Sequence, residues 1–248
     1  MTALSINLNK IALIRNSRVG NYPNVIEMAE QCINLGADGI TVHPRPDQRH
    51  IRPSDVRQLA NLVNSINTVE FNIEGNPFAE PLADYPGLLA LVEETQPDQC
   101  TLVPDSNHQL TSDHGFDLKA QGIELEPIIQ QIKSLGVRVS LFMDPDLEQI
   151  QLASQVGADR IELYTGPYAA AWGTDGLKGI FQQHVAAAKL ADSLGLGVNA
   201  GHDLNLHNLG KFASIENLLE VSIGHAFTVD SLNMGMPSAV SAYKALLV

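Results

Sequence analysis

Short runs of strand-forming residues alternate with longer helical stretches eight times along this chain, and this alternation limits the folds open to it. Several helical stretches end in glycine just before the next run, as at Gly36 and Gly136, where glycine can adopt the left-handed turn that stops a helix. A repeated order of strand, helix and glycine stop is typical of parallel strands joined by crossover helices. The eight runs are Ser5–Asn9, Gly39–His43, Val69–Glu74, Cys100–Pro104, Arg138–Asp144, Arg160–Thr165, Gly197–Gly201 and Leu219–Gly224.

Eight such units in 248 residues predict an α/β fold, a (β/α)8 or TIM barrel, whose usual size is about 250 residues. An open doubly wound sheet is the alternative, but its dinucleotide-binding form needs GxGxxG after the first strand, where this chain reads NKIALIR. No low-complexity linker divides the chain, so we expect residues 1–248 to form a single barrel domain. Residues 105–122 are expected to form a long loop, and residues 226–236 leave room for a short extra helix before a last helix that Pro237 would start.

The charge and cysteine content exclude several classes of protein. The chain has 15 Lys and Arg against 28 Asp and Glu, a net charge of −13, which argues against nucleic acid or an anionic membrane as the main partner. No run approaches the roughly 20 apolar residues of a membrane span, and the first ten residues lack a signal-peptide core. Cys32 and Cys100 lie far apart without a CxxC pair, as in a reducing compartment. We therefore expect a cytoplasmic protein that acts on a small molecule.

The alternation of side chains along each run predicts which residues face the interior of the barrel. In the second run, for example, Ile40 and Val42 would point towards the helices while Thr41 and His43 point inwards. The inward residues become ionisable towards the carboxyl ends of the runs, which is the end where TIM barrels place their active sites.

Histidines and carboxylates gather at this end. His43, His202 and His225 lie at or just past the ends of predicted strands, and Glu74 and Glu162 face inwards near the ends of theirs. A histidine beside a carboxylate in a barrel mouth favours acid–base chemistry on a small substrate. A metal site is the alternative, but the chain lacks local spacings such as HxH or HExxH, so we expect no metal.

Longer strings resemble the pyridoxine 5'-phosphate synthase family, in order and over nearly the whole chain. They are GADGITVHPRPDQRHI (36–51), the strand end NIE (72–74), LVP (102–104) followed by Thr111, VSLFMDPD (139–146), IELYTGPYA (161–169), GLGVNAGHDLNLHN (195–208) and SIGHA (222–226). The resemblance implies a TIM barrel with extra short helices that assembles into homo-oligomers, typically octamers. It also implies a transferase-type synthase of vitamin B6 biosynthesis, which closes the pyridine ring from 1-deoxy-D-xylulose 5-phosphate and 3-amino-2-oxopropyl phosphate. Phosphate and water are released, and neither a metal nor an organic cofactor is used.

The resemblance also implies roles for individual residues. His43 is similar to the family's acid/base, Glu74 to its general base and His202 to its proton donor or acceptor, while Glu162 corresponds to an auxiliary polar residue. The residues that match positions binding the two phosphorylated substrates are Asn7, Arg18, Arg45, His50, Thr111, Gly224 and His225.

The chain departs from the family pattern at four positions. Asn9 and Lys10 stand where the family has Asp-His, Asp203 where it has glycine, and Asp230 where it has arginine. A new carboxylate beside a phosphate site opposes anion binding, so these departures predict altered specificity. Three functions stay open: the synthase, a divergent paralogue with a different small carbonyl or amine substrate, and a non-catalytic small-molecule-binding barrel. The retained acid–base residues favour an enzyme.

Overall fold

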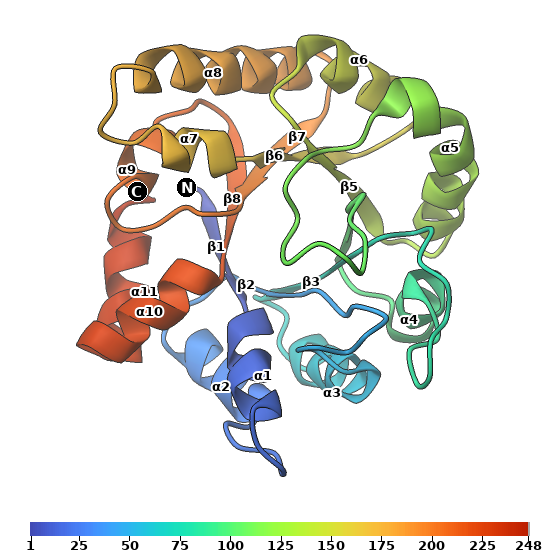
Figure 1. Ribbon diagram of the computed structural model, residues 1–248, viewed down its shortest axis with the longest axis vertical. Coiled ribbons are helices and arrows are strands. Elements are labelled where there is room, and N and C mark those ends of the chain that lie inside the picture. Colours follow the sequence, from blue (N-terminus) through green and yellow to red (C-terminus); the bar gives the residue numbers. More distant parts are fainter. Residues whose placement is uncertain (248) are drawn as a thin grey trace.

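The computed structural model describes residues 1–247, in which eight parallel strands close into a barrel. Neighbouring strands follow the order of the sequence, and the barrel closes where β1 pairs with β8 and Ile6 lies opposite Ile223. Figure 1 shows the ring of strands inside a ring of helices, so the TIM-barrel prediction is confirmed. The strands are β1 (Ala3–Asn7), β2 (Gly39–Val42), β3 (Glu70–Gly75), β4 (Gln99–Leu102), β5 (Arg138–Met143), β6 (Arg160–Tyr164), β7 (Gly197–Gly201) and β8 (Leu218–Ile223).

The helices begin and end where local chemistry dictates. The side chains of Asn24, Asp117 and Asp146 accept hydrogen bonds from backbone N–H groups in the first turns of α2, α5 and α6. Gly36 and Gly136 have φ angles of 105° and 81°, so both helix stops predicted there are confirmed. The helices are α1 (Asn9–Asn16), α2 (Val25–Asn34), α3 (Pro53–Asn64), α4 (Leu88–Thr95), α5 (Leu118–Ser134), α6 (Leu147–Gln155), α7 (Gly166–Ala170), α8 (Leu177–Ser193), α9 (Leu209–Phe212), α10 (His225–Met234) and α11 (Met236–Ala245).

The predicted strand bounds differ from the structure by one or two residues in every strand except β7, and the loop after β4 is shorter than predicted. The first strand ends at Asn7, because Asn9 already begins α1. The loop after β4 ends at residue 117, because the Asp117 side chain caps α5 at a point where the sequence predicted loop as far as residue 122. The extra helix before the last one is present as α10, and Pro237 lies in the first turn of α11, as predicted.

Apolar and polar side chains separate across the barrel wall as the alternation predicts. Ile6, Ile40 and Phe71 are fully buried between the strands and the helices. Inside the barrel, the Ser5 and Thr41 hydroxyls lie 2.7 Å apart. These polar side chains fill the interior of the barrel. The inward residues closer to the carboxyl ends of the strands therefore face the open end of the barrel.

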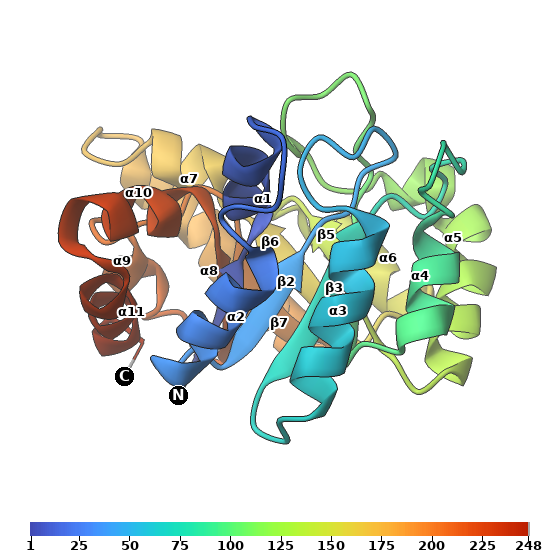
Figure 2. The same cartoon turned by 90° about the horizontal axis from the view of Figure 1, so that it is seen from below.

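The loops that follow the strands rise at one end of the molecule. Figure 2 shows the loops of residues 43–52 and 103–117 at the end opposite the N-terminus, which is the carboxyl end of the strands. Within residues 1–247, no helix is long and apolar enough to cross a bilayer.

Candidate active site

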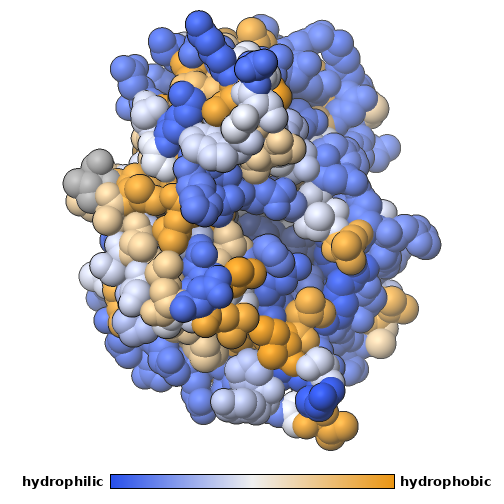
Figure 3. Space-filling view, turned by 60° about the vertical axis from the view of Figure 1, so that its left-hand side comes forward, coloured by the Kyte–Doolittle hydropathy of each residue, from blue (hydrophilic) through white to orange (hydrophobic). Residues whose placement is uncertain are grey.

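A cavity of about 580 Å³ opens at the carboxyl ends of the strands. Figure 3 shows the surface hollowed among largely hydrophilic residues. The volume is in the range of small-molecule sites. The predicted site residues that line this cavity are Asn7, His43, Arg45, His50, Glu74, Thr111, Glu162, His202, Gly224 and His225.

Arg18 does not join the other predicted residues. It lies in the exposed segment after α1, where its guanidinium donates to the Ser17 carbonyl at 3.0 Å. The buried arginine of this region is Arg15, whose Nη1 lies 2.6 Å from Asp55 Oδ1 and whose Nη2 donates to the His50 carbonyl at 3.0 Å. Arg15 thereby ties α1 to α3 and holds the loop that carries His50.

His43 lies between two buried carboxylates. Its Nδ1 is 3.6 Å from Glu74 Oε2, and its Nε2 is 3.2 Å from Asp105 Oδ2. Burial alone would lower the pKa of His43, but the carboxylates of Asp105 and Glu74 outweigh burial and raise this pKa to about 9. His43 is therefore an imidazolium at neutral pH, and its charge is matched by the two acids beside it.

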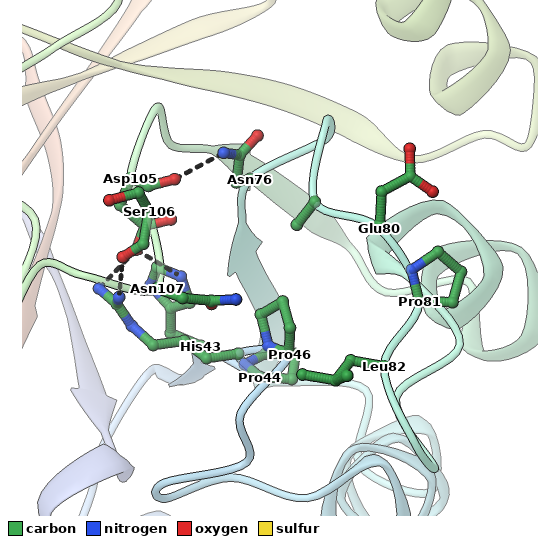
Figure 4. Close-up of a pocket in the computed structure, with 12 residues that line it drawn as sticks. His43, Pro44, Pro46, Asn76, Glu80, Pro81, Leu82, Asp105, Ser106 and Asn107 are labelled. Carbon is green, nitrogen blue, oxygen red and sulfur yellow. Dashed lines mark hydrogen bonds and ion pairs between the residues drawn. The ribbon is translucent and has the colours of Figure 1, made fainter.

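Asp105 holds a second cation as well. Arg45 Nη2 lies 2.5 Å from Asp105 Oδ2, and Arg45 Nη1 donates to the Ser106 carbonyl at 3.1 Å. The Asp105 carbonyl in turn accepts from Asn76 Nδ2 at 2.5 Å, as Figure 4 shows beside a smaller cavity of about 290 Å³. Asp105 thus joins the loop after β2 (residues 43–52, the β2 loop) to the loop after β4 (residues 103–117, the β4 loop).

His50 is held in the opposite charge state. Its Nδ1 accepts a hydrogen bond from the Ile51 backbone N–H at 2.9 Å. Burial, and after it the positive charges of His43, Arg45 and Lys10, lower the pKa of His50 to about 3. A neutral ring whose Nδ1 accepts carries its proton on Nε2, so His50 offers one N–H donor to the cavity.

Glu162 lies deep in the cavity, where Gly201 leaves room for it. A Cβ atom at Gly201 would lie 2.0 Å from Glu162 Oε1, so a larger residue there would displace the carboxyl group. Burial first, and then the negative charges of Glu74 and Glu220, raise the pKa of Glu162 well above its usual value. This favours a neutral carboxylic acid that can donate a hydrogen bond.

His202 is contacted at both ring nitrogens. Its Nδ1 lies 2.9 Å from Asp203 Oδ2, and its Nε2 lies 2.7 Å from the Thr111 hydroxyl oxygen. The Tyr164 ring packs edge-on against the imidazole at a centroid distance of 5.3 Å. His202 therefore connects β7 to the loop after β4.

The residues that depart from the family pattern fall into two groups. Asn9, Lys10 and Asp203 line the cavity, and Asn9 Oδ1 accepts from the His43 backbone N–H at 2.9 Å. Asp230 does not line it, contrary to the expectation, because its carboxylate accepts a hydrogen bond from the Tyr243 hydroxyl at 2.6 Å.

The sequence analysis missed Asp105 and Arg49. Asp105 comes three residues after β4, at the same end of the barrel as the other acids, and that position was the signal available. Arg49 donates to the carbonyls of Gln109 and Asn107 at 2.8 and 2.7 Å, and so fastens the β4 loop over the cavity. Arg49 also pairs with Asp47 at 2.6 Å, and although it lies within the string of residues 36–51, nothing in that string showed that it would bind carbonyls of another loop. In the described part of the chain, no three His, Cys, Asp or Glu residues are grouped to hold a metal ion.

A closed parallel barrel whose histidines and carboxyl groups converge at the carboxyl ends of its strands has the arrangement of a TIM-barrel enzyme. Comparison with known proteins identifies the family. The model of the family described as "Pyridoxal phosphate biosynthesis protein PdxJ" matches residues 4–248, so the chain belongs to this family.

Curated relatives are similar over nearly their full length. A pyridoxine 5'-phosphate synthase from Xanthomonas campestris pv. campestris (strain B100) is 54% identical over 247 residues, which are 99% of this chain and 96% of the relative. A pyridoxine 5'-phosphate synthase from Xylella fastidiosa (strain M23) is 53% identical over 99% of this chain and 95% of the relative.

Solved structures add support for the fold alone. The 3-hexulose-6-phosphate synthase of Salmonella typhimurium superposes with a TM-score of 0.65 at 14% identity, covering 99% of this chain and 98% of that one. KGPDC of Streptococcus mutans gives a TM-score of 0.64 at 11% identity, covering 100% and 97%.

Proposed function

We propose that this chain is a pyridoxine 5'-phosphate synthase, which condenses 1-deoxy-D-xylulose 5-phosphate with 3-amino-2-oxopropyl phosphate and closes the pyridine ring. The observation that carries the proposal is the His43–Glu74 pair, 3.6 Å apart, in one cavity with His202. The family match over residues 4–248 supports the same reaction.

The charge states of the acidic and basic groups suit this chemistry. Condensing an amine with a ketone expels water, and a protonated His43 can supply the proton that the leaving oxygen needs. Closing the ring requires removal of a carbon-bound proton, for which Glu74 is the assigned base. Glu162, held as a neutral acid, can hydrogen-bond the oxygen atoms of the intermediate without adding a negative charge close to Glu74.

Two separate groups of donors suit two phosphorylated substrates. Arg45 and the Nε2–H of His50 lie on the β2 side of the cavity. Gly224 and His225 lie on the β8 side, where α10 begins and presents backbone N–H groups. We assign one phosphate to each group, with Asn7 and Thr111 as further polar contacts. Arg18 has no geometric support for a binding role within this chain.

A second candidate function is the same chemistry on a different small carbonyl or amine. It is favoured by Lys10, which brings a primary amine to the cavity lining at a position where the family has an imidazole. Product analysis with the family's substrates distinguishes the two candidates.

We propose that the enzyme works in the cytoplasm as a homo-oligomer, an octamer by family resemblance. Both cysteines are free and buried, in keeping with a reducing compartment. Leu13 and Ile14 on α1, and Val229 and Leu232 on α10, are 42–78% exposed on two helices that contact each other, an apolar surface suited to a second copy. Light scattering of wild type and Leu232→Glu tests this, and equal masses at the monomer value would contradict it.

Complementation of a pyridoxine-requiring bacterial strain that lacks the synthase tests the proposed function. Wild type should restore growth without added pyridoxine, and Glu74→Gln should not. Glu93→Gln, which alters an exposed acid on α4, should restore growth like wild type. Absence of growth with a soluble, folded wild-type protein would contradict the proposal.

A further inference from the structure

Asp203 places a carboxylate against His202 at the corner that follows β7. The Asp203 Oδ2 atom lies 2.9 Å from His202 Nδ1, and His202 Nε2 lies 2.7 Å from the Thr111 hydroxyl oxygen. The three side chains therefore form one line of contacts, from β7 across the cavity mouth to the loop after β4.

The backbone at this corner would suit glycine better than aspartate. His202 and Asp203 have φ angles of 84° and 57°, both in the left-handed region that side chains disfavour. The corner is held by Thr165 Oγ1, which donates to the Gly201 carbonyl at 2.8 Å and to the His202 carbonyl. Since glycine would adopt this conformation at less cost, the backbone does not explain the Asp203 side chain, and its contact with His202 does.

The contacts fix which ring nitrogen carries the proton. An ionised carboxylate only accepts hydrogen bonds, so the 2.9 Å contact requires a proton on His202 Nδ1. The hydrogen bond from His202, the largest influence, lowers the pKa of Asp203, which keeps this carboxylate ionised. In a neutral imidazole the other nitrogen, Nε2, is then the acceptor, and the Thr111 hydroxyl donates to it.

Asn9, at the start of α1, supplies no charge to this part of the cavity. Its amide oxygen accepts a hydrogen bond from the His43 backbone N–H at 2.9 Å. Asp203 places one carboxylate in the cavity lining, next to His202 and two strands away from Asn9 around the barrel.

We propose that Asp203 is a positioning residue for His202: it holds the imidazole with its proton on Nδ1, so that Nε2 begins the reaction as a proton acceptor. A substrate phosphate that takes the Thr111 hydroxyl frees Nε2 to remove a proton from the bound substrate. The imidazolium formed keeps its Nδ1–H on Asp203 and later returns the Nε2 proton to the leaving oxygen. The inference deepens the proposed function and rests on it for the identity of the substrate.

Two aspartate variants separate the charge from the hydrogen bond. Asp203→Asn keeps an acceptor oxygen without the charge, and Asp203→Gly removes the acceptor while relieving the left-handed backbone. Asp175→Asn, at an exposed site away from the cavity, is the control for loss of one negative charge.

The test combines nitrogen-15 NMR of the histidine rings, without substrate, with steady-state kinetics. Wild type and Asp203→Asn should show the Nδ1–H form of His202, and Asp203→Gly should shift towards the Nε2–H form. We expect kcat to fall roughly 10–100-fold in Asp203→Gly and by less in Asp203→Asn, which keeps the acceptor for Nδ1–H, with little change in KM, and to stay unchanged in Asp175→Asn.

An Nε2–H ring in wild type, or an unchanged kcat in Asp203→Gly, would overturn the inference. Asp203→Gly should unfold at the same or higher denaturant concentration than wild type, which separates a lower kcat from loss of structure. The NMR experiment uses no substrate, so it tests the His202 proton independently of the synthase reaction. If the proposed function is wrong but this inference is right, His202 will show the Nδ1–H form in a protein without synthase activity.

Discussion

The Nε2 atom of His43 lies 3.2 Å from Asp105 Oδ2, within a site where both side chains are about 95% buried. Asp105 is shared with Arg45, so one carboxylate holds the acid of the proposed reaction and a proposed phosphate ligand in a fixed relation. Movement of the β4 loop, which carries Asp105, would therefore alter proton transfer and anion binding together.

Asp105→Asn should lower the free energy of unfolding more at pH 6.5 than at pH 9. The pKa of His43 is raised to about 9 in the folded protein, so its stabilising contribution is complete below pH 6.5 and is lost as the pH rises through 9. The variant lacks most of this contribution at every pH. In urea unfolding, the difference in free energy of unfolding between wild type and Asp105→Asn should be roughly 1–3 kcal/mol smaller at pH 9 than at pH 6.5. An equal difference at the two pH values would contradict the ion pair.

Glu162→Gln should become more stable relative to wild type as the pH rises from 5 to 8. The folded pKa of Glu162 is raised by burial and by Glu74, so wild type loses stability once the pH exceeds the pKa of the unfolded chain. The glutamine has no proton to lose. Urea unfolding at several pH values measures the free energy of unfolding of each variant relative to wild type. For the control Glu93→Gln this difference should not change with pH. A difference that does not change with pH for Glu162→Gln would contradict a neutral Glu162.

Gly201→Ala should destabilise the protein by roughly 1–3 kcal/mol and lower kcat, because the new methyl group would lie 2.0 Å from Glu162 Oε1. Gly179→Ala is the matched control, since a Cβ atom there meets nothing within 4 Å on α8. That control should be neutral or stabilising by roughly 0.5–1 kcal/mol. Thermal melts measure the change in stability and steady-state kinetics the change in kcat. Equal stability and equal kcat in the two variants would show that the Glu162 side chain can move aside without cost.

Arg15→Met should cost roughly 3–5 kcal/mol, because it leaves the buried Asp55 carboxylate without its partner. Arg18→Met, at an exposed site on the same segment, should change the free energy of unfolding of the isolated chain by less than about 0.5 kcal/mol. Urea denaturation compares the two variants. Similar losses would mean that the Arg15–Asp55 pair is not what stabilises this end of the barrel.

The barrel was predictable because each strand repeats the same local pattern, and the inward direction of His43 and Glu74 followed from alternation along single strands. Contacts between loops carry no such period. Asp105 and Arg49 lie on different loops, and their partners include backbone atoms, so neither position could be assigned before the loops were placed. The family pattern marked Arg18, but only the structure shows that Arg15 is the buried residue.

Asp203 illustrates a second limit. Its replacement of glycine was visible in the sequence and suggested weaker phosphate binding, yet its contact with His202 depends on a left-handed turn that no local pattern revealed. Asp230 was grouped with it, although Asp230 accepts from Tyr243 and does not line the cavity. Residues that look alike as substitutions therefore differ in what they contact.

The most direct test of the account is product analysis with the purified protein. Incubation with 1-deoxy-D-xylulose 5-phosphate and 3-amino-2-oxopropyl phosphate should yield pyridoxine 5'-phosphate and inorganic phosphate in equal amounts, measured by chromatography and a phosphate assay. Glu74→Gln should reduce the rate by roughly 100-fold or more. If folded wild-type protein consumes neither substrate, or releases phosphate without forming the pyridine ring, the proposed synthase activity is wrong.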